Sequence, residues 1–68
     1  KKKIFLINSE KNLLEINDKI YNKDNELLGE VISKSILVNN LFYSLGIIKV
    51  GSENNMLISK NIPLTIIH

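Results

Sequence analysis

The sequence lacks several residue types that small domains use for stability or for chemistry. Its 68 residues include no cysteine, arginine or tryptophan, and only one histidine, one proline and three glycines. The missing cysteine excludes disulfides, and no cluster of histidines or carboxylates is spaced for a structural metal. A chain of this length forms at most one domain, with a core that supplies only about 3–5 kcal/mol. We therefore expect dense aliphatic packing, or a neighbouring domain against which one face rests.

Targeting and membrane-spanning segments are also missing. The sequence has no signal peptide and no apolar run long enough to cross a bilayer. We therefore predict a cytoplasmic protein with no membrane partner. Since the chain opens on Lys1 rather than on methionine, its simplest interpretation is a C-terminal fragment of a longer protein.

The charge pattern argues against a nucleic-acid partner. The formal net charge is only +2, and nine lysines are interleaved with seven acidic residues. A nucleic-acid interface needs clustered lysine and arginine with aromatic side chains nearby. The only basic cluster is Lys1 to Lys3, and arginine is missing. We interpret the lysines as part of a solvated surface.

Short runs of β-branched and aromatic residues, bounded by polar turns, indicate strands and no helix. The expected strands are residues 3–8, 19–21, 27–38, 41–50, 56–59 and 62–67, with a short apolar piece at 13–16. Residues 22–26 and the pair Asn39 and Asn40 are the clearest turns, because Asn and Asp tolerate the left-handed conformation. This spacing predicts a small closed antiparallel barrel of about six strands, Greek-key-like, since closure removes exposed strand edges.

The expected strand 27–38 is longer than an ordinary strand. Gly29 allows it to bend or bulge near its start, as at the corner of a small barrel, and Gly46 indicates a second bulge in strand 41–50. Pro63 has no backbone donor, so the last strand should begin at an edge or a bulge. Alternation along 27–38 places one set of side chains on the inner face: Val31, Ser33, Ser35 and Leu37.

No constellation of residues predicts an active site, and we expect neither catalytic nor metal-binding residues. Ser33 and Ser35 have no partner base and are interpreted as small core-facing residues. Residues 24–26 offer oxygen ligands, yet they lack the spacing of a calcium loop. His68 has no candidate ligand beside it. Tyr43 belongs either to the rim of the core or to a surface that packs on a partner domain or a ligand.

Six short segments follow one another in the order of a known family. They are Lys2-Lys3-Ile4-Phe5, Asn17-Asp18-Lys19-Ile20-Tyr21, Leu28-Gly29-Glu30-Val31-Ile32-Ser33, Leu45-Gly46-Ile47-Ile48, Met56-Leu57-Ile58 and Ile62-Pro63-Leu64-Thr65-Ile66. This series covers nearly the whole chain and resembles the C-terminal barrel of the glycine-cleavage T-protein superfamily. That barrel carries "Gly-Asp-x-Val/Ile-Tyr" and then "Val-Gly-x-Val-Thr-Ser".

Three departures from the family pattern favour one branch of it. Asn17 replaces the usual Gly, Ile32 replaces Thr, and no "Ser-Pro" follows the serine strand. The chain therefore resembles the YgfZ-type folate-binding proteins of iron–sulfur cluster assembly more than a true aminomethyltransferase, which stays as an alternative. The resemblance implies an accessory, non-catalytic barrel beside sister domains that hold tetrahydrofolate. The family's "Lys-Gly-Cys-Tyr-x-Gly-Gln-Glu" motif lies in those domains, so only Gly29, Val31 and Ser33 carry over, as structural residues.

A second family offers another interpretation. Residues 23–31 are similar to the "Asp-x-Asp-x-x-Leu-Leu-Gly-x-Val" segment of PRC-type barrels, which bind protein or RNA in ribosome maturation. That family usually has an acidic run after this segment, whereas Ser33-Lys34-Ser35 stands here. An enzyme is the third and weakest hypothesis, because no nucleophile has a base beside it in the sequence.

Overall fold

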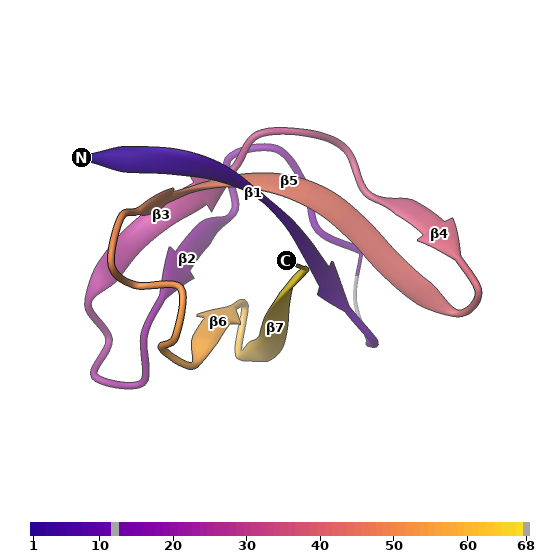
Figure 1. Ribbon diagram of the computed structural model, residues 1–68. Coiled ribbons are helices and arrows are strands. Elements are labelled where there is room, and N and C mark those ends of the chain that lie inside the picture. The colour runs from indigo at the N-terminus through magenta and orange to yellow at the C-terminus, as the bar shows by residue number, and fades with distance from the viewer. Residues whose placement is uncertain (12, 68) are drawn as a thin grey trace.

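The computed structural model describes residues 1–11 and 13–67, in which every regular element is a β-strand (Figure 1). The strands are β1 (Lys2–Ser9), β2 (Lys19–Tyr21), β3 (Leu27–Val31), β4 (Ile36–Val38), β5 (Leu41–Lys49), β6 (Leu57–Ser59) and β7 (Ile62–Ile67). All paired strands are antiparallel. The all-β prediction is confirmed. Among the described residues, no helix is long and apolar enough to cross a membrane.

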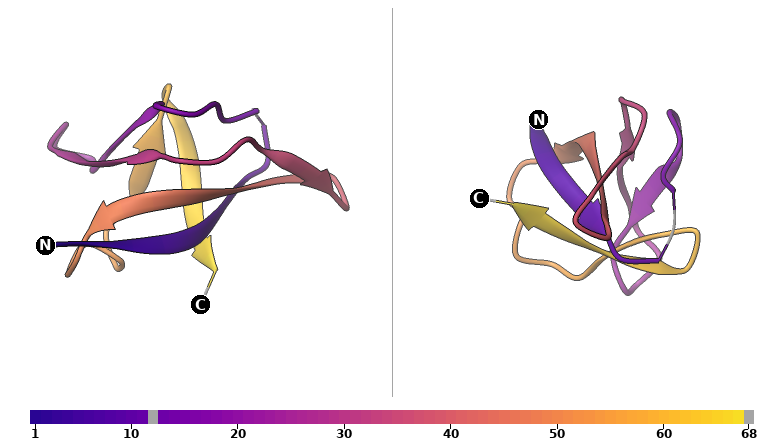
Figure 2. Two further views of the ribbon diagram at one scale, coloured as in Figure 1. Left: turned by 90° about the horizontal axis from the view of Figure 1, so that it is seen from above. Right: turned by 90° about the vertical axis from the view of Figure 1, so that its right-hand side faces the viewer.

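Pairing between β1 and β5 closes the sheet into a barrel. Around the ring the order is β1–β7–β6–β2–β3–β5, and β5 then pairs with β1. This last ladder runs without interruption from Lys2 opposite Lys49 to Ser9 opposite Phe42, and Figure 2 shows the two long strands side by side. β4 is a seventh strand outside the ring, paired with β5 alone. The predicted closed barrel of about six strands is confirmed.

The connections have Greek-key character. Strands β2, β3 and β5 are antiparallel neighbours in that order, while β1 reaches β2 through a long connection and lies on the far side of β5. A first strand that packs beside the last strand of such a meander is the Greek-key arrangement. The chain therefore brings its first strand against a strand more than thirty residues away.

The barrel interior is filled by aliphatic side chains from almost every strand. The buried core consists of Ile7, Leu14, Ile20, Leu28, Val31, Ile48, Leu57, Leu64 and Ile66, with Phe5 packed against it. Leu14 comes from the apolar piece at 13–16, which is not a strand. The dense aliphatic packing expected from the sequence is therefore present.

Asparagine-containing turns set the strand registers. Asn39 and Asn40 have φ angles of 50° and 68° and join β4 to β5, as predicted. Lys60 and Asn61 have φ angles of 53° and 63° and join β6 to β7 in the same way. Two consecutive residues with positive φ form the type I′ turn, whose twist matches that of the flanking strands. Pro63 follows this turn and lies opposite Ile58 of β6. The pairing of β7 with β1 begins only at Thr65, so the nitrogen of Pro63, which cannot donate a hydrogen bond, lies at an unpaired edge, as expected.

The expected strand 27–38 is divided in two, and this prediction was wrong. β3 ends at Val31 and β4 begins at Ile36, although both pair with the same edge of β5. The bend near Gly29 is confirmed, because Ile20 lies opposite Gly29 while Tyr21 lies opposite Leu27, which leaves one residue of β3 unpaired.

The prediction of which side chains of residues 27–38 point inward was also mostly wrong. Val31 is fully buried, but Ser33 and Ser35 are only partly buried and Leu37 is 59% exposed. The physical reason is that the chain leaves the barrel wall after Val31, so alternation from β3 no longer applies.

The two glycines of the barrel wall act through close packing. The bulge expected at Gly46 is absent, because the ladder to β1 continues through it without a shift and Gly46 still pairs with Val31 at the end of the ladder to β3. A Cβ atom there would lie 3.1 Å from Cδ1 of Ile7 and 3.2 Å from Cδ1 of Ile20, so this glycine makes room for core side chains. At Gly29, a Cβ atom would overlap the backbone carbonyl of Ile47.

Alanine substitutions at Gly29 and Gly46 should destabilise the fold by different amounts. Gly29→Ala forces the backbones of β3 and β5 apart and should cost at least about 3 kcal/mol, enough to unfold a domain of this size. Gly46→Ala meets only the ends of two flexible side chains, so it should cost less, about 1–2 kcal/mol. Urea denaturation followed by circular dichroism measures both. Equal stability of the two variants would contradict the close backbone approach at Gly29.

Candidate functional site

The four residues singled out from the sequence lie along one seam between β3 and β5. Gly29 lies opposite Ile48, and Val31 lies opposite Gly46. Ser33 continues the same line, because its Oγ accepts a hydrogen bond from the amide of Leu45 at 2.8 Å. The structure thus brings Gly29, Val31, Ser33 and Gly46 together. Their surroundings are backbone, aliphatic side chains and the hydroxyl of Ser44, so the seam serves the fold.

The serine hydroxyls tie backbone segments together instead of filling the core. Ser44 Oγ donates to the carbonyl of Ser33 at 2.7 Å, and Ser35 Oγ both donates to and accepts from the backbone of Leu14, each at 2.9 Å. The fully buried Ser59 donates to the carbonyl of Lys19 at 2.7 Å. Since these hydroxyls bond to main chain and face no basic side chain, none is an activated nucleophile.

Charged side chains of the described residues form ion pairs on the surface, and Lys60 pairs with both Asp18 and Glu15. Lys19 Nζ donates to Glu30 Oε1 at 2.7 Å, and Lys60 Nζ lies 3.0 Å from Asp18 Oδ2. The hydrogen bond and charge of Lys19 lower the pKa of Glu30, and Glu30 raises the pKa of Lys19 for the same reasons. Within residues 1–11 and 13–67, no group of three or more His, Asp or Glu residues could hold a metal ion.

Turn 22–26 is organised around an asparagine and not around a cation. The Oδ1 atom of Asn22 accepts hydrogen bonds from the amides of Asp24 and Glu26, both at 2.9 Å. Asn22 Nδ2 donates to the Glu26 carboxylate at 3.0 Å. The Oδ1 atom of Asn22 and one carboxylate oxygen of Glu26 are therefore used inside the turn itself. His68, the one imidazole of the sequence, lies outside the described residues.

The outer side of the barrel carries a continuous apolar surface. Leu6 of β1 lies directly opposite Leu45 of β5 on one side and Ile67 of β7 on the other, so three aliphatic side chains form a row across three strands. Directly opposed residues point to the same face of a sheet. The next row is Ile4 opposite Ile47, and the amide of Ile32 bonds to the carbonyl of Leu45 at 2.9 Å. We call this set the outer face: Ile4, Leu6, Ile32, Leu45, Ile47 and Ile67.

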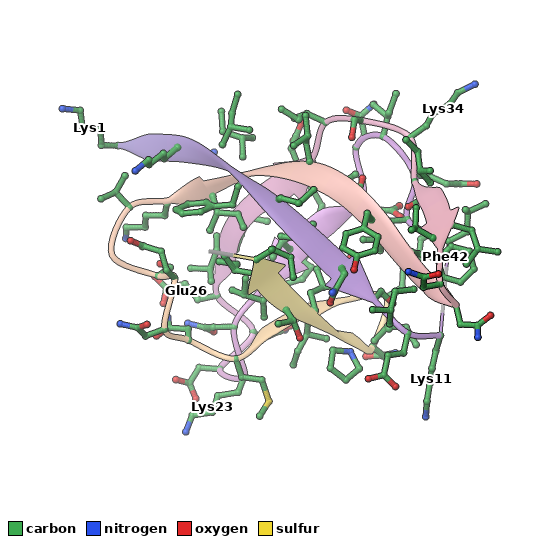
Figure 3. All side chains as sticks on the ribbon, turned by 45° about the vertical axis from the view of Figure 1, so that its right-hand side comes forward. Lys1, Lys11, Lys23, Glu26, Lys34 and Phe42 are labelled. Atoms are coloured by element: carbon green, nitrogen blue, oxygen red, sulfur yellow. The ribbon has the colours of Figure 1, made fainter. Side chains whose placement is uncertain are left out.

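The outer face is open to solvent. Five of its six side chains are exposed, from 36% for Ile32 to 55% for Ile4, and Ile47 is half-buried. Tyr43 is partly buried and lies opposite Asn8 of β1 and Ile36 of β4, beside the Leu45 row. It belongs to the rim of this surface and not to the interior. Figure 3 shows the side chains on the paired β1 and β5 ribbons.

Two lysines lie together at one end of the outer face. Lys2 and Lys49 are directly opposite each other on β1 and β5, an arrangement of like charges that disfavours the pair. Lys49 Nζ is 3.9 Å from Glu26 Oε2, and Lys2 forms no ion pair with any described carboxylate. The charge of Lys2 also lowers the pKa of Glu30, so the positive charge at this end is partly neutralised within the chain.

The hollows of the surface are shallow. One hollow of about 410 Å³ lies between residues 13–16 and Lys34 and Ser35, with mostly aliphatic walls. A hollow of about 160 Å³ lies between the end of β1 and the start of β7. In the described part of the chain, every buried side-chain nitrogen or oxygen has a hydrogen-bond partner. Neither hollow therefore contains an unsatisfied buried polar atom that would select a small ligand.

The outer face is a candidate functional feature that sequence reasoning missed. The sequence did carry a signal for this surface, because residues 3–8 and 41–50 are apolar at both odd and even positions. A strand with one solvent-exposed face would instead alternate between apolar and polar residues. Such runs are typical of strands covered on both faces. In this chain the barrel core covers only one of the two faces.

Comparisons with known proteins do not identify the chain. No protein-family model matches it, and no curated protein or solved structure matches it either.

The Lys19–Glu30 pair predicts a pH dependence of stability. Because the folded pKa of Glu30 is lowered, its contribution is present above the ordinary pKa near 4.5 and is lost as the pH falls through the folded value. The raised pKa of Lys19 gives a contribution that is lost at alkaline pH. Glu30→Gln should therefore lower the melting temperature at neutral pH, and its difference from the parent should shrink in acid.

The matched control for this prediction is Glu10→Gln, which removes an exposed carboxylate away from the ion pair. Thermal melts from neutral to acid pH compare the three proteins. A difference between Glu30→Gln and the parent that stays constant down to the lowest pH would contradict the assignment.

Proposed function

We propose that this barrel is a non-catalytic accessory domain that packs its outer face against another protein domain. The observation that carries the proposal is the aliphatic row Leu45–Leu6–Ile67, which crosses three strands on the solvent side. The outward side of an antiparallel sheet normally alternates to polar residues. A contiguous apolar patch on a small domain marks an interaction surface.

The charges at the end of this surface specify the chemistry of the partner. Lys2 and Lys49 repel each other across the β1–β5 ladder. Carboxylates on a partner domain would neutralise both lysines while the aliphatic row is buried. The partner is therefore a protein surface with an apolar centre and an acidic margin at the Lys2–Lys49 end.

The resemblance to T-protein-like barrels supplies a candidate for that partner. It implies a YgfZ-type protein of iron–sulfur cluster assembly, in which sister domains hold tetrahydrofolate and the barrel stands beside them. Two hollows of the described residues are shallow and have no unsatisfied buried polar group, which favours a cofactor held mainly by the sister domains. In this proposal the cofactor belongs to the sister domains, and this chain supplies one wall of the cleft.

Thiol labelling tests the docking surface, because the chain has no native cysteine. Leu45→Cys introduces one thiol at the centre of the outer face, and Met56→Cys introduces a matched thiol on an exposed turn. Both should react quickly in the isolated chain. In the full gene product, the thiol at position 45 should become protected by at least about tenfold, while the thiol at position 56 stays reactive. Equal labelling at position 45 in the two proteins would overturn the proposal.

Calorimetry with tetrahydrofolate tests the candidate partner separately. The chain alone should give no binding heat, and the full gene product should bind the cofactor. Binding by the chain alone would show that a folate site lies within this barrel. If position 45 is protected but the full product ignores tetrahydrofolate, the docking surface stands and the folate assignment fails.

A further inference from the structure

The one strand outside the ring leaves an unprotected sheet edge. β4 pairs only with β5, and its side chains Ile36, Leu37 and Val38 are 65%, 59% and 46% exposed. In Figure 1 the β4–β5 hairpin projects beyond the rest of the barrel. Natural edge strands are usually protected by a charge, a proline or a bulge. None of these is present between Ile36 and Val38.

The turn fixes which backbone groups of β4 face outward. In a two-residue type I′ hairpin, the residues that flank the turn form a hydrogen-bonded pair, and such pairs alternate along the ladder. Val38 opposite Leu41 and Ile36 opposite Tyr43 are therefore the bonded pairs. The amide and carbonyl of Leu37 point away from β5. Among the described residues, no other segment hydrogen-bonds to the backbone of β4.

We infer that β4 pairs with β4 of a second copy of this chain, antiparallel and centred on Leu37. In that register Leu37 lies opposite the partner's Leu37, and the two residues exchange two N–H···O bonds. Ile36 lies opposite the partner's Val38, so aliphatic side chains meet on the same face. The two barrels then share one sheet that continues through both β4–β5 hairpins.

Charge favours a second copy as the occupant. The three residues of β4 are uncharged, and the nearest charged residue along the sequence is Lys34, two positions before the strand. No like charges are opposed, so a strand of the same sequence fits this edge without repulsion.

Engineered disulfide formation tests the register. Opposed residues of a hydrogen-bonded antiparallel pair have Cα atoms about 5.5 Å apart, within the range that a disulfide spans. Leu37→Cys should therefore form a covalent dimer under mild oxidation. Met56→Cys, an equally exposed single thiol, should stay largely monomeric. Equal yields from the two variants would overturn the register.

Sedimentation of the unmodified chain tests the association itself. The average mass should rise with protein concentration from one chain of 7.8 kDa toward two. Leu37→Lys places like charges on the two-fold axis and should abolish this rise, whereas Met56→Lys and Leu45→Ser should not. A monomer at all concentrations up to about 1 mM would contradict the inference. Association that survives Leu37→Lys but is lost in Leu45→Ser would assign self-association to the outer face instead.

Discussion

The ladder between β1 and β5 is the interaction on which the rest of the molecule depends. It joins the first strand to the longest strand over the whole length of β1, and without it the remaining strands would form an open sheet. A domain of this size, with no disulfide, has little stability to spare. Closure removes the two edges of the ring and buries Ile7 and Ile48 completely. The glycine at position 46 belongs to the same ladder and leaves space for the Ile7 side chain.

The same ladder creates the outer face. Because β1 lies between β5 and β7, the outward side chains Leu6, Leu45 and Ile67 are brought into one row. In an open sheet, Leu45 would have no opposed neighbour from β1. The apolar surface is therefore a consequence of barrel closure, and a partner that covers it would stabilise the closed form. The proposed packing on another domain would therefore add stability to a small barrel that has little of its own.

The turns and the barrel could be predicted from the sequence because their causes are local. Asn39 and Asn40 adopt the positive φ angles that few other residues tolerate, and Gly29 marks the corner where two backbones meet. The break after Val31 could not be predicted. It depends on Ser33, whose hydroxyl takes the place of a backbone acceptor for the amide of Leu45, a residue twelve positions away. The role of Gly46 likewise depends on side chains from two distant strands.

The outer face shows a different limit of sequence reasoning. An aliphatic strand without alternation indicates apolar residues on both faces but does not reveal which face meets the core, so the exposed row could be assembled only once the register was known. The resemblances to T-protein-like and PRC-type barrels rest on short segments and remain predictions, since a shared barrel does not specify a function.

Native-state hydrogen exchange tests the closure of the barrel most directly. If β1 closes the ring, the amides of β1 that bond to β5 should exchange only through global unfolding, with the same free energy as the core amides of β5. Rapid exchange throughout β1, with continued protection of β3 and β5, would show an open sheet and would contradict both the barrel and its outer face.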